Sequence, residues 1–286
     1  MHTPTTLESR IARYSKVLSE KTLTRTHALV IGVGSVGRPL ALQLASMGVE
    51  YLTIFDPDTV ASTNLGSQGY PERWCVGNNY ESCIGELKIN VLVPALEDLN
   101  PLIDLRVFAQ PFTPETPTHR ITESNLVPDP TVAFLCVDAM STRLECAKAI
   151  LNAWPSCTLI DCRVAAETGR IVMVPPFVRT PDGAVSGQSL DRLEFYERRW
   201  FPDSEGLTLP CGYQATLFSS TLAASIAISR WTLVDRYLDA TPPIEITADD
   251  CDWVYDLLCM TLQPNPLPEG EETDDQEELE HLHAVV

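Results

Sequence analysis

Short apolar runs alternate with segments of helical spacing through the first half of the chain. Residues 28–33 read ALVIGV and lead into a glycine-rich loop, the pattern of a strand buried on both faces. Residues 38–47 follow with apolar positions at helical spacing, and Gly48 is placed to end that helix. Residues 51–55 form a second apolar run that ends at Asp56. This order predicts strand, loop, helix and strand in turn.

The same alternation continues along the chain. It predicts helices over 88–99 and 141–153, and strands over 104–108, 132–137, 158–160 and 170–174. Alternating strands and helices favour an α/β, doubly wound, Rossmann-like and mostly parallel sheet flanked by helices. Ligands of such sheets bind at the carboxyl ends of the strands.

The remaining segments complete the predicted organisation. We expect a helical N-terminal segment over 1–26, a functional loop with local structure over 57–85, a mixed insertion over 175–210, a long helix over 214–238 and a closing strand or helix over 244–262. These form one domain, residues 1–262. Residues 263–286 are rich in Pro and then in acids, which predicts a disordered tail.

Charge and cysteine usage restrict the partners and the compartment. The net charge is −19, and removing the eight acids of PEGEETDDQEELE leaves about −11. Nucleic acid and anionic membranes are therefore disfavoured as bulk partners. No secretory signal and no apolar run of about 18–20 residues is found. The nine cysteines form no C-x-x-C pair, and the odd count favours reduced thiols in a cytoplasm.

The glycine-rich loop is the first chemical signal. Gly32, Gly34 and Gly37 lie between a strand and a helix, where glycines let a backbone approach a pyrophosphate and the helix N-terminus offers N–H groups to anions. Asp56 lies 19 residues beyond Gly37 and suits a ribose hydroxyl. These residues alone fit an NAD(P) enzyme as well as an ATP enzyme.

The segments FDPDTVASTNLGSQGY and GELKINVLVPALEDLNP then resemble the adenylation domain shared by ThiF, MoeB and the ubiquitin-activating enzymes. The resemblance covers residues 10–150 and rests on the glycine loop, Asp56 with Asp58, Asn64-Leu65 with Gln68, Gly85 with Lys88, and Asn100-Pro101. It implies that 1–262 is an adenylation domain that uses ATP and Mg²⁺ to activate the C-terminal carboxylate of a small ubiquitin-like or sulfur-carrier protein. The size resembles that of bacterial members.

The resemblance also implies roles for single residues. Lys88 would contact the phosphates, Asp138 would hold Mg²⁺ and take part in catalysis, Asp56 would bind the ribose, and Asn64 and Gln68 would contact the nucleotide. Two alternatives stay open at this point. Lys88 can be a solvated helix lysine, and Asp138 can be a cap for the helix that follows it.

Four positions, Ser67, Arg13, Arg10 and Arg163, bear on the arginines of the site. Ser67 stands where the family usually has Arg, so one phosphate-binding guanidinium is missing. Arg13-Tyr14 matches a family segment that reaches the partner subunit's site, which implies a homodimer, with Arg10 as the fallback. Arg163 can replace the missing arginine or hold the substrate's C-terminus, and it can equally be a structural partner of Glu167.

Cys211 lies just before the predicted long helix, where family members that pass their substrate to a thiol carry a cysteine. It is a candidate nucleophile or an ordinary buried cysteine, and a conjugating enzyme is a candidate acceptor. Ser67 keeps an alternative open, a catalytically impaired relative that acts as a binding or heterodimer partner. An NAD(P) oxidoreductase is disfavoured because it has no use for Asn64, Gln68 and Lys88 in that order.

Overall fold

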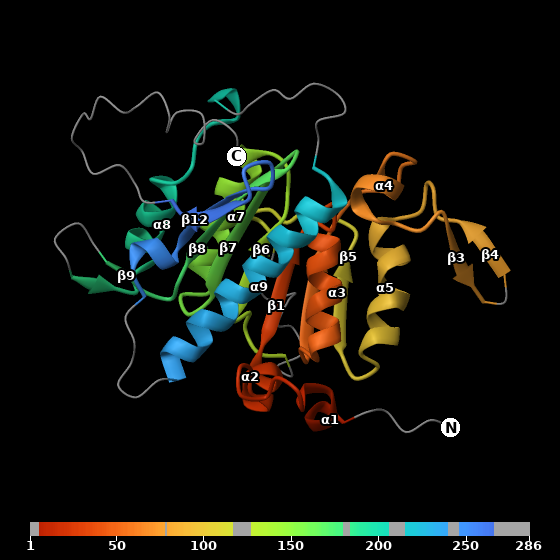
Figure 1. Ribbon diagram of the computed structural model, residues 1–286, viewed down its shortest axis with the longest axis horizontal. Coiled ribbons are helices and arrows are strands. Elements are labelled where there is room, and N and C mark those ends of the chain that lie inside the picture. The colour runs from red at the N-terminus through yellow and green to blue at the C-terminus, as the bar shows by residue number, and fades with distance from the viewer. Residues whose placement is uncertain are drawn as a thin grey trace.

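A computed structural model describes residues 6–77, 79–116, 127–179, 184–205, 215–239 and 246–265. Its centre is an eight-stranded sheet in the order β12-β11-β8-β7-β6-β1-β2-β5 (Figure 1). The pairs from β7 to β5 are parallel, and β8, β11 and β12 join through antiparallel pairs. The bounds are β1 His27–Ile31, β2 Tyr51–Phe55, β5 Asp104–Phe108, β6 Val132–Leu135, β7 Thr158–Ala165, β8 Thr168–Val174, β11 Asp252–Asp256 and β12 Thr261–Pro264. The predicted doubly wound, mostly parallel sheet is confirmed.

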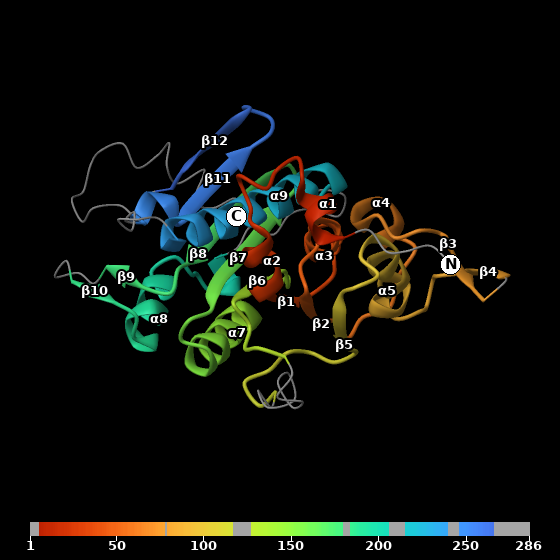
Figure 2. The ribbon, with the colours of Figure 1, turned by 90° about the horizontal axis from the view of Figure 1, so that it is seen from below.

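Helices cover both faces of this sheet, as Figure 2 shows from below. One layer holds α3 (Gly37–Met47), α5 (Lys88–Leu99) and α9 (Leu217–Asp239), and the other holds α7 (Met140–Ala153) and α8 (Ser189–Glu197). Strand β1 shows why both layers are needed. Its buried residues alternate, with Val30 in the core under α3 and Leu29 in the core under α7. A strand with two buried faces reads as a continuous apolar run, which is the pattern seen in the sequence.

The N-terminal segment forms two short helices, α1 (Leu7–Ile11) and α2 (Glu20–Arg25), at the lower edge of the molecule in Figure 1. Arg10 on α1 donates to the carbonyls of Ser46 (3.2 Å) and Leu99 (2.7 Å), at the ends of α3 and α5. A cation is favourable at helix C-termini because the last carbonyls carry partial negative charge. Arg10 therefore joins the far ends of two helices.

Several segments contain more regular structure than the spacing predicted. The segment 57–85 holds α4 (Asn64–Gln68) and the hairpin β3 (Arg73–Val76) and β4 (Asn79–Ser82). The two predicted short strands near residue 165 are one long hairpin, β7–β8, whose turn includes Ala166 at a φ of 52°. Alanine is not a residue typical of turns or of positive φ, so no turn is indicated at Ala166 by its residue type.

The C-terminal half also differs from its expectation in detail. The insertion after residue 175 contains β9 (Val178–Arg179), β10 (Val185–Ser186), α8 and η1 (Asp203–Glu205). The closing segment is η2 (Ala248–Asp250) followed by the hairpin β11–β12, so the predicted boundary at residue 262 falls inside β12. Residues 266–286, which carry the acidic run, lie outside the described residues.

Helix α9 is long and apolar enough, over Leu217–Arg236, to pass a length and composition test for a membrane-spanning helix. Half of that window is buried inside the fold, and Ala223, Ala227 and Trp231 belong to the core beneath the sheet. A core helix passes the same test. The long helix predicted over 214–238 is therefore a core helix, packed against β7, β8 and α3.

Candidate functional site

A cleft of about 880 Å³ lies at the carboxyl ends of the parallel strands. The loops after β1, β2 and β6, the start of α5 and the end of β7 contribute to its lining. This is the edge at which ligands of doubly wound sheets bind. The sequence-predicted residues that line it are Gly32, Gly34, Asp56, Asp58, Asn64, Gln68, Lys88, Asp138 and Arg163.

Each of the three glycines of the loop is required for a different structural reason. Gly32 has a φ of +87°, and a Cβ there would lie 2.8 Å from the Cys136 carbonyl oxygen. A Cβ on Gly37 would lie 1.8 Å from the carbonyl oxygen of Gly32, so only glycine fits at the start of α3. Around Gly34 the nearest atom is 3.8 Å away, on the Gln68 side chain. Gly34 is therefore the point at which a ligand can approach the backbone closely.

The start of α3 is left open to an anion. Its N-cap residue, Val36, makes no side-chain cap, and its first turn contains no acidic residue. The first N–H groups of a helix have no intrahelical acceptor, and the helix dipole favours negative charge there. With Gly34 beside it, this helix start has the chemistry of a phosphate site.

Asp56 fixes the loop from the end of β2. Its carboxylate accepts the backbone N–H groups of Val33 (2.7 Å) and Asp58 (2.8 Å), and its side chain is buried. Burial raises the pKa of the Asp56 carboxyl more than these two N–H bonds lower it. The Tyr70 hydroxyl donates to the Val33 carbonyl (2.8 Å), a second tie on the same loop residue. Asp56 thus shapes the loop as well as lining the cleft.

Lys88 is the first residue of α5, and its Nζ lies 2.9 Å from the Asp58 carboxylate. The Lys88 side chain is only 7% exposed, whereas that of Asp58 is 63% exposed. The backbone N–H of Lys88 also donates to the Asp58 carbonyl at 2.9 Å. Lys88 is therefore a buried cation held at the cleft, which excludes the alternative of a solvated helix lysine.

Helix α4 presents Asn64 and Gln68 to the cleft and Ser67 away from its lining. The Asn64 side-chain oxygen accepts the Ala61 N–H at 2.8 Å, which holds the helix start. Gln68 Oε1 is buried and has no partner among the described residues, so it is an acceptor available to a ligand. The Ser67 hydroxyl donates to the Thr63 carbonyl at 2.8 Å and makes only a local contact.

Arg38 is a polar residue near this region that the sequence reading did not single out. Its guanidinium carbon lies 5.1 Å from the centre of the Tyr70 ring, and its Nε is buried without an acceptor in the described ranges. Burial lowers the pKa of Arg38. Arg38 does not line the cleft, so it does not supply the guanidinium that Ser67 lacks inside it. Its signal was an arginine directly after the last glycine of the loop.

Asp138 follows β6 and is exposed at the cleft. One of its oxygens accepts the neighbouring Ala139 N–H at 2.9 Å. The cap of α7 is a different residue. Asp203 accepts the backbone N–H groups of Met140 (2.6 Å) and Ser141 (3.2 Å). The alternative of Asp138 as a helix cap is therefore wrong, because a distant aspartate occupies that position.

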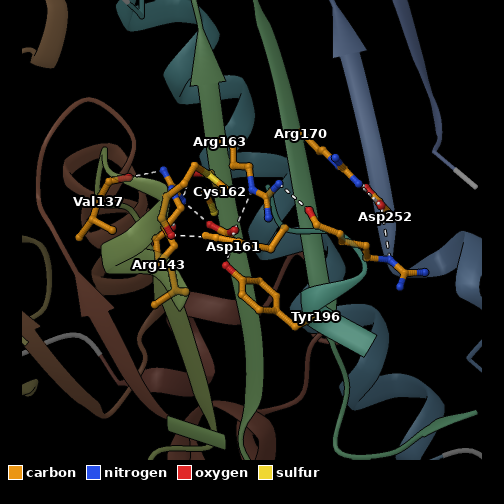
Figure 3. Close-up of polar contacts among 12 residues, drawn as sticks. Val137, Arg143, Asp161, Cys162, Arg163, Arg170, Tyr196 and Asp252 are labelled. Carbon is orange, nitrogen blue, oxygen red and sulfur yellow. Dashed lines mark hydrogen bonds and ion pairs between the residues drawn. The ribbon is translucent and has the colours of Figure 1, made fainter. Parts of the chain in front are cut away.

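Arg163 belongs to a buried polar network, drawn in Figure 3. Its Nε donates to Asp161 (2.8 Å) and its Nη1 donates to the Arg199 carbonyl (2.8 Å). Asp161 also accepts Tyr196 Oη (2.9 Å) and pairs with Arg143 from α7. The proposed pairing of Arg163 with Glu167 is wrong, since Asp161, two residues away on the same strand face, takes that place.

Charge within the network fixes its protonation. Burial alone would raise the pKa of Asp161, but Arg143 and Arg163 outweigh burial and hold that pKa below its usual range. Burial would lower the pKa of Arg163, and the charge of Asp161 instead raises it. Asp161 is therefore ionised and Arg163 protonated at neutral pH. In the sequence, Asp161-Cys162-Arg163 follows an apolar run. That pattern indicated two residues of the network, Asp161 and Arg163.

Two thiols line the same cleft. Cys136 comes directly after β6, and Cys162 lies on β7, the parallel neighbour of β6. A hydrogen bond joins the two side chains. This bond, with burial, holds the pKa of the Cys162 thiol well above its usual range. Because the thiolate is the nucleophile, Cys162 is poorly suited to that role at neutral pH. Cys211, the predicted candidate nucleophile, lies outside the described residues.

Arg13 and Arg10 lie at the opposite end of the molecule from the cleft. They belong to the segment at α1 that contacts the ends of α3 and α5, whereas the cleft lies at the starts of these helices. Arg13 is exposed, and it does not reach the cleft of its own chain. Arg10, the fallback, donates hydrogen bonds to the Ser46 and Leu99 carbonyls of its own chain.

The residues that line the cleft fit ATP because of three features. The space around Gly34 is open, the start of α3 has no side-chain cap, and the Gln68 Oε1 acceptor has no partner among the described residues. Among the described residues no group of three His, Cys, Asp or Glu side chains could hold a metal ion. Mg²⁺ is commonly bound by one or two carboxylates together with substrate phosphates. Three aspartates line the cleft, of which Asp56 holds the loop and Asp58 pairs with Lys88. The chemistry of the third, Asp138, fits a nucleotide-bound Mg²⁺.

The fold and the cleft together define a doubly wound α/β protein with an open cleft at the carboxyl ends of its parallel strands. A model of the ThiF family matches residues 9–196, more than half of the chain, and the chain belongs to this family. The resemblance seen over residues 10–150 is thereby confirmed.

Curated relatives agree with this assignment. The chain is 34% identical over 113 residues to the "Adenylyltransferase and sulfurtransferase MOCS3" of Dictyostelium discoideum, covering 40% of this chain and 25% of that protein. It is 29% identical over 157 residues to the "Sulfur carrier protein ThiS adenylyltransferase" of Escherichia coli strain K12, covering 55% and 56%. The chain thus spans between a quarter and about half of the length of these relatives.

Solved structures show the same fold at low sequence identity. PaaA superposes with a TM-score of 0.60 at 18% identity, covering 90% of this chain and 68% of that one. E. coli MccB with ATP gives a TM-score of 0.57 at 13% identity, covering 91% and 69%. E. coli tRNA N6-threonylcarbamoyladenosine dehydratase with AMP gives 0.55 at 15% identity, covering 80% and 96%.

Proposed function

We propose that this protein is an adenylyltransferase that uses ATP to activate the C-terminal carboxylate of a small ubiquitin-like or sulfur-carrier protein. The observation that carries the proposal is the convergence on one cleft of an open glycine loop, a buried lysine and an uncommitted aspartate, which are Gly34, Lys88 and Asp138. Membership of the ThiF family supports it, since relatives that share the domain carry adenylyltransferase names.

In the reaction, a carboxylate oxygen of the substrate protein forms a bond to the α-phosphorus of ATP. The bond between that phosphorus and the bridging oxygen to the β-phosphate breaks, and pyrophosphate leaves with the electron pair. No proton has to move in this step, so the work of the protein is placement and charge stabilisation. This is why the cleft needs cations and N–H donors more than a general base.

The residues divide that work along the sheet. The start of α3 and the backbone at Gly34 would hold phosphate oxygens, and Lys88 would add a positive charge beside them. Asp56 would bind the ribose hydroxyls, and Asn64 and Gln68 would contact the nucleotide. Asp58 would keep Lys88 in place until the phosphates compete for it. Mg²⁺ held by Asp138 would neutralise charge on the phosphates.

We further propose a homodimer in which Arg13 of one subunit enters the cleft of the other. Its exposed position at the end of the molecule opposite its own cleft supports this reading, because it leaves the guanidinium available to a second copy. Arg13 would then supply the phosphate contact that Ser67 cannot make.

The fate of the activated carboxylate is a separate proposal. The acyl adenylate would pass to a sulfur donor or a conjugating enzyme, with Cys211 as a candidate intermediate thiol. A reducing cytoplasm suits these steps, and eight cysteines in the described residues are free thiols. The net charge of −19 supports a protein partner over nucleic acid or an anionic membrane. A protein adduct that is lost with a thiol reductant and in Cys211→Ala is expected if Cys211 carries the substrate.

ATP–pyrophosphate exchange tests the central proposal. Purified protein is incubated with ATP, Mg²⁺, labelled pyrophosphate and each of a panel of ubiquitin-like and sulfur-carrier proteins. We expect label to enter ATP only when a suitable protein with a free C-terminus is present. Absence of exchange with every partner, together with absence of ATP binding by calorimetry, would overturn the proposal.

The second candidate is a catalytically impaired relative that binds a partner subunit, and Ser67 is the observation that favours it. Such a protein would retain partner binding and lack exchange. ATP binding without exchange, combined with a stable heterodimer with an active ThiF-family chain, would support this candidate.

A further inference from the structure

We propose that Arg163, supported by Arg143, binds the terminal carboxylate of the substrate protein beside the nucleotide. This inference rests on the proposed adenylation function and assigns the site of its second substrate. The substrate class is a polypeptide with a free C-terminal carboxylate.

The buried network carries more positive than negative charge. Asp161 is shared by Arg143 and Arg163, and Asp252 is shared by Arg170 and Arg199. All six side chains are buried. Two carboxylates therefore face four guanidinium groups within the described residues. A buried charge is costly unless it is paired, so this excess of cations calls for an anion from outside the network.

Three guanidinium nitrogens of the network are buried without a hydrogen-bond acceptor among the described residues. One, Arg199 Nε, lies 3.4 Å from the Asp252 carboxylate as an ion pair, and the other two lie on the Arg163 side. Arg163 uses Nε and Nη1, and its Nη2 is buried without an acceptor in the part of the chain that the structure describes. The Nε of Arg143 is in the same situation. The side chains of Arg163 and Arg143 are 4% and 6% exposed. A buried N–H donor without an acceptor destabilises the folded protein, and a bound acceptor removes that cost.

Only this half of the network opens to the cleft. Arg143 and Arg163 belong to the lining of the cleft, whereas Arg170 and Arg199 do not. Figure 3 shows Arg143 and Arg163 reaching Asp161 from α7 and β7, with the Arg170–Asp252 pair further along the sheet. The missing anion would therefore enter from the cleft.

The order of the strands separates the proposed place of the substrate carboxylate from that of the phosphates. The groups proposed for the nucleotide come from the loops after β1 and β2 and from α5. Asp138 follows β6, on the other side of β1, and Arg163 lies on β7, one strand further. The part of the cleft beyond the phosphates is thus the part that Arg163 faces. A nucleophile aimed at the α-phosphorus has to sit there.

The surroundings of Arg163 at this end of the cleft are largely apolar. Phe201, Val164, Ala165 and Ala215 line this end of the cleft, and the Arg163 guanidinium carbon lies 5.5 Å from the Phe201 ring centre. Apolar walls lower the local dielectric and strengthen a guanidinium–carboxylate pair. The planar fork of an arginine holds one carboxylate in a fixed orientation.

Arg163 acts on the substrate before the reaction. The carboxylate is negative when it arrives, and it loses that charge when its oxygen bonds to the α-phosphorus. The contact is therefore stronger with the substrate than with the acyl adenylate. It lowers the KM for the substrate protein, and it leaves the KM for ATP unchanged.

The experiment compares a free carboxylate with its amide, using N-acetyl-glycylglycine and N-acetyl-glycylglycinamide as probes. Ligand-observed NMR measures both Kd values in the presence of a non-hydrolysable ATP analogue. We expect wild-type protein to bind the acid about 10- to 100-fold more tightly than the amide, the range of a charge-assisted hydrogen bond. Arg163→Gln should remove this preference and raise the KM for the substrate protein in pyrophosphate exchange by a similar factor.

Arg170→Gln is the matched control, because it breaks an ion pair of the same network outside the cleft. It should keep the preference for the acid even if it lowers the Tm. If Arg163→Gln does not fold, Arg163→Lys keeps the charge without the fork and should weaken the preference. Equal Kd values for acid and amide in wild-type protein would overturn the inference. ATP binding and exchange, measured separately, report on the adenylation proposal itself.

Discussion

Asp203 accepts the backbone N–H of Met140 at 2.6 Å and thereby caps α7 from a position 63 residues further along the chain. An aspartate is among the best N-cap residues, because its oxygen satisfies N–H groups that have no intrahelical acceptor. Asp138 lies two residues before the start of this helix, and among the described residues it accepts a hydrogen bond from Ala139 alone. The helix start and the cleft thus use two different aspartates, and substitutions can separate their roles.

Asp203→Ala should lower the Tm by a few degrees at neutral pH and leave ATP binding in place. Bonds from the Ser141 hydroxyl and the Met140 N–H hold the pKa of Asp203 below its usual range. A carboxyl with a depressed folded-state pKa stabilises the fold above its unfolded pKa and loses that effect as the pH falls through the folded value. Thermal unfolding of wild type and variant at pH 7 and pH 3 should show a difference that shrinks at the lower pH. An equal difference at both pH values would contradict this assignment.

Asp138→Asn should reduce pyrophosphate exchange by about 100-fold or more, the size of effect expected when a group that stabilises transferring charge is removed. Its Tm should match that of wild type, since Asp138 is exposed and does not cap α7. Exchange assays and differential scanning calorimetry on the same preparations check both parts. Exchange at the wild-type level would remove Asp138 from the site.

Lys88→Met should weaken ATP binding and lower exchange by about 100-fold, because a buried cation at the phosphates is lost. Lys148→Met is the matched control. Lys148 pairs with Glu197 at 3.4 Å on an exposed surface, where ion pairs contribute little. Calorimetric titration with ATP and exchange kinetics should separate the two variants. Similar behaviour of both would contradict a phosphate role for Lys88.

Arg13→Ala and Lys88→Ala chains should each be inactive alone and recover activity when mixed. If Arg13 acts on the partner's cleft, the mixed dimer has one intact site, and random pairing gives about a quarter of the wild-type activity. A mixture of Lys88→Ala with Asp138→Asn should not recover, because both changes disable the cleft of their own chain. Exchange after unfolding and joint refolding measures this. Lack of recovery in the first mixture would place Arg13 outside the partner's site.

Asp161→Asn should destabilise the fold by about 3–5 kcal/mol, because it leaves Arg143 and Arg163 buried without their shared anion. Urea denaturation at pH 7 measures the change. Glu194→Gln is the control, since Glu194 pairs with Arg198 on the surface and should cost less than about 1 kcal/mol. The folded-state pKa of Asp161 is depressed, so its contribution should persist down to its unfolded pKa near 4 and decline only below it. A similar loss in both variants would contradict this account.

Local patterns were sufficient to predict which residues line the cleft at the ends of β1 and β2 and at the start of α5. The glycine loop, Asp56 and Lys88 each follow a strand or open a helix, and parallel strands bring their carboxyl ends to one edge. The same rule placed Asp138 there. These residues lie where short-range spacing and sheet topology alone put them.

Long-range partners could not be predicted in this way. Nothing near Met140 in the sequence indicates that Asp203 caps its helix, and the network around Asp161 joins residues from α7, β7 and α8. Arg163 illustrates the limit. Its place after an apolar run indicated a candidate, and the structural partner considered for it was Glu167, nearby in sequence, whereas the structure pairs Arg163 with Asp161. The turn at Ala166 lacked the residues that normally indicate a hairpin.

Arg10 has a consequence for the geometry of the cleft. Helix α3 begins at the glycine loop and α5 begins at Lys88, and Arg10 bridges their last turns through the Ser46 and Leu99 carbonyls. Each helix is roughly 16–18 Å long at 1.5 Å per residue, so the bridge lies that far from the glycine loop and Lys88. The relative position of Gly37 and Lys88 thus depends in part on a contact at the far ends of the two helices. A substitution that removes the Arg10 guanidinium would remove that constraint without altering any residue that lines the cleft.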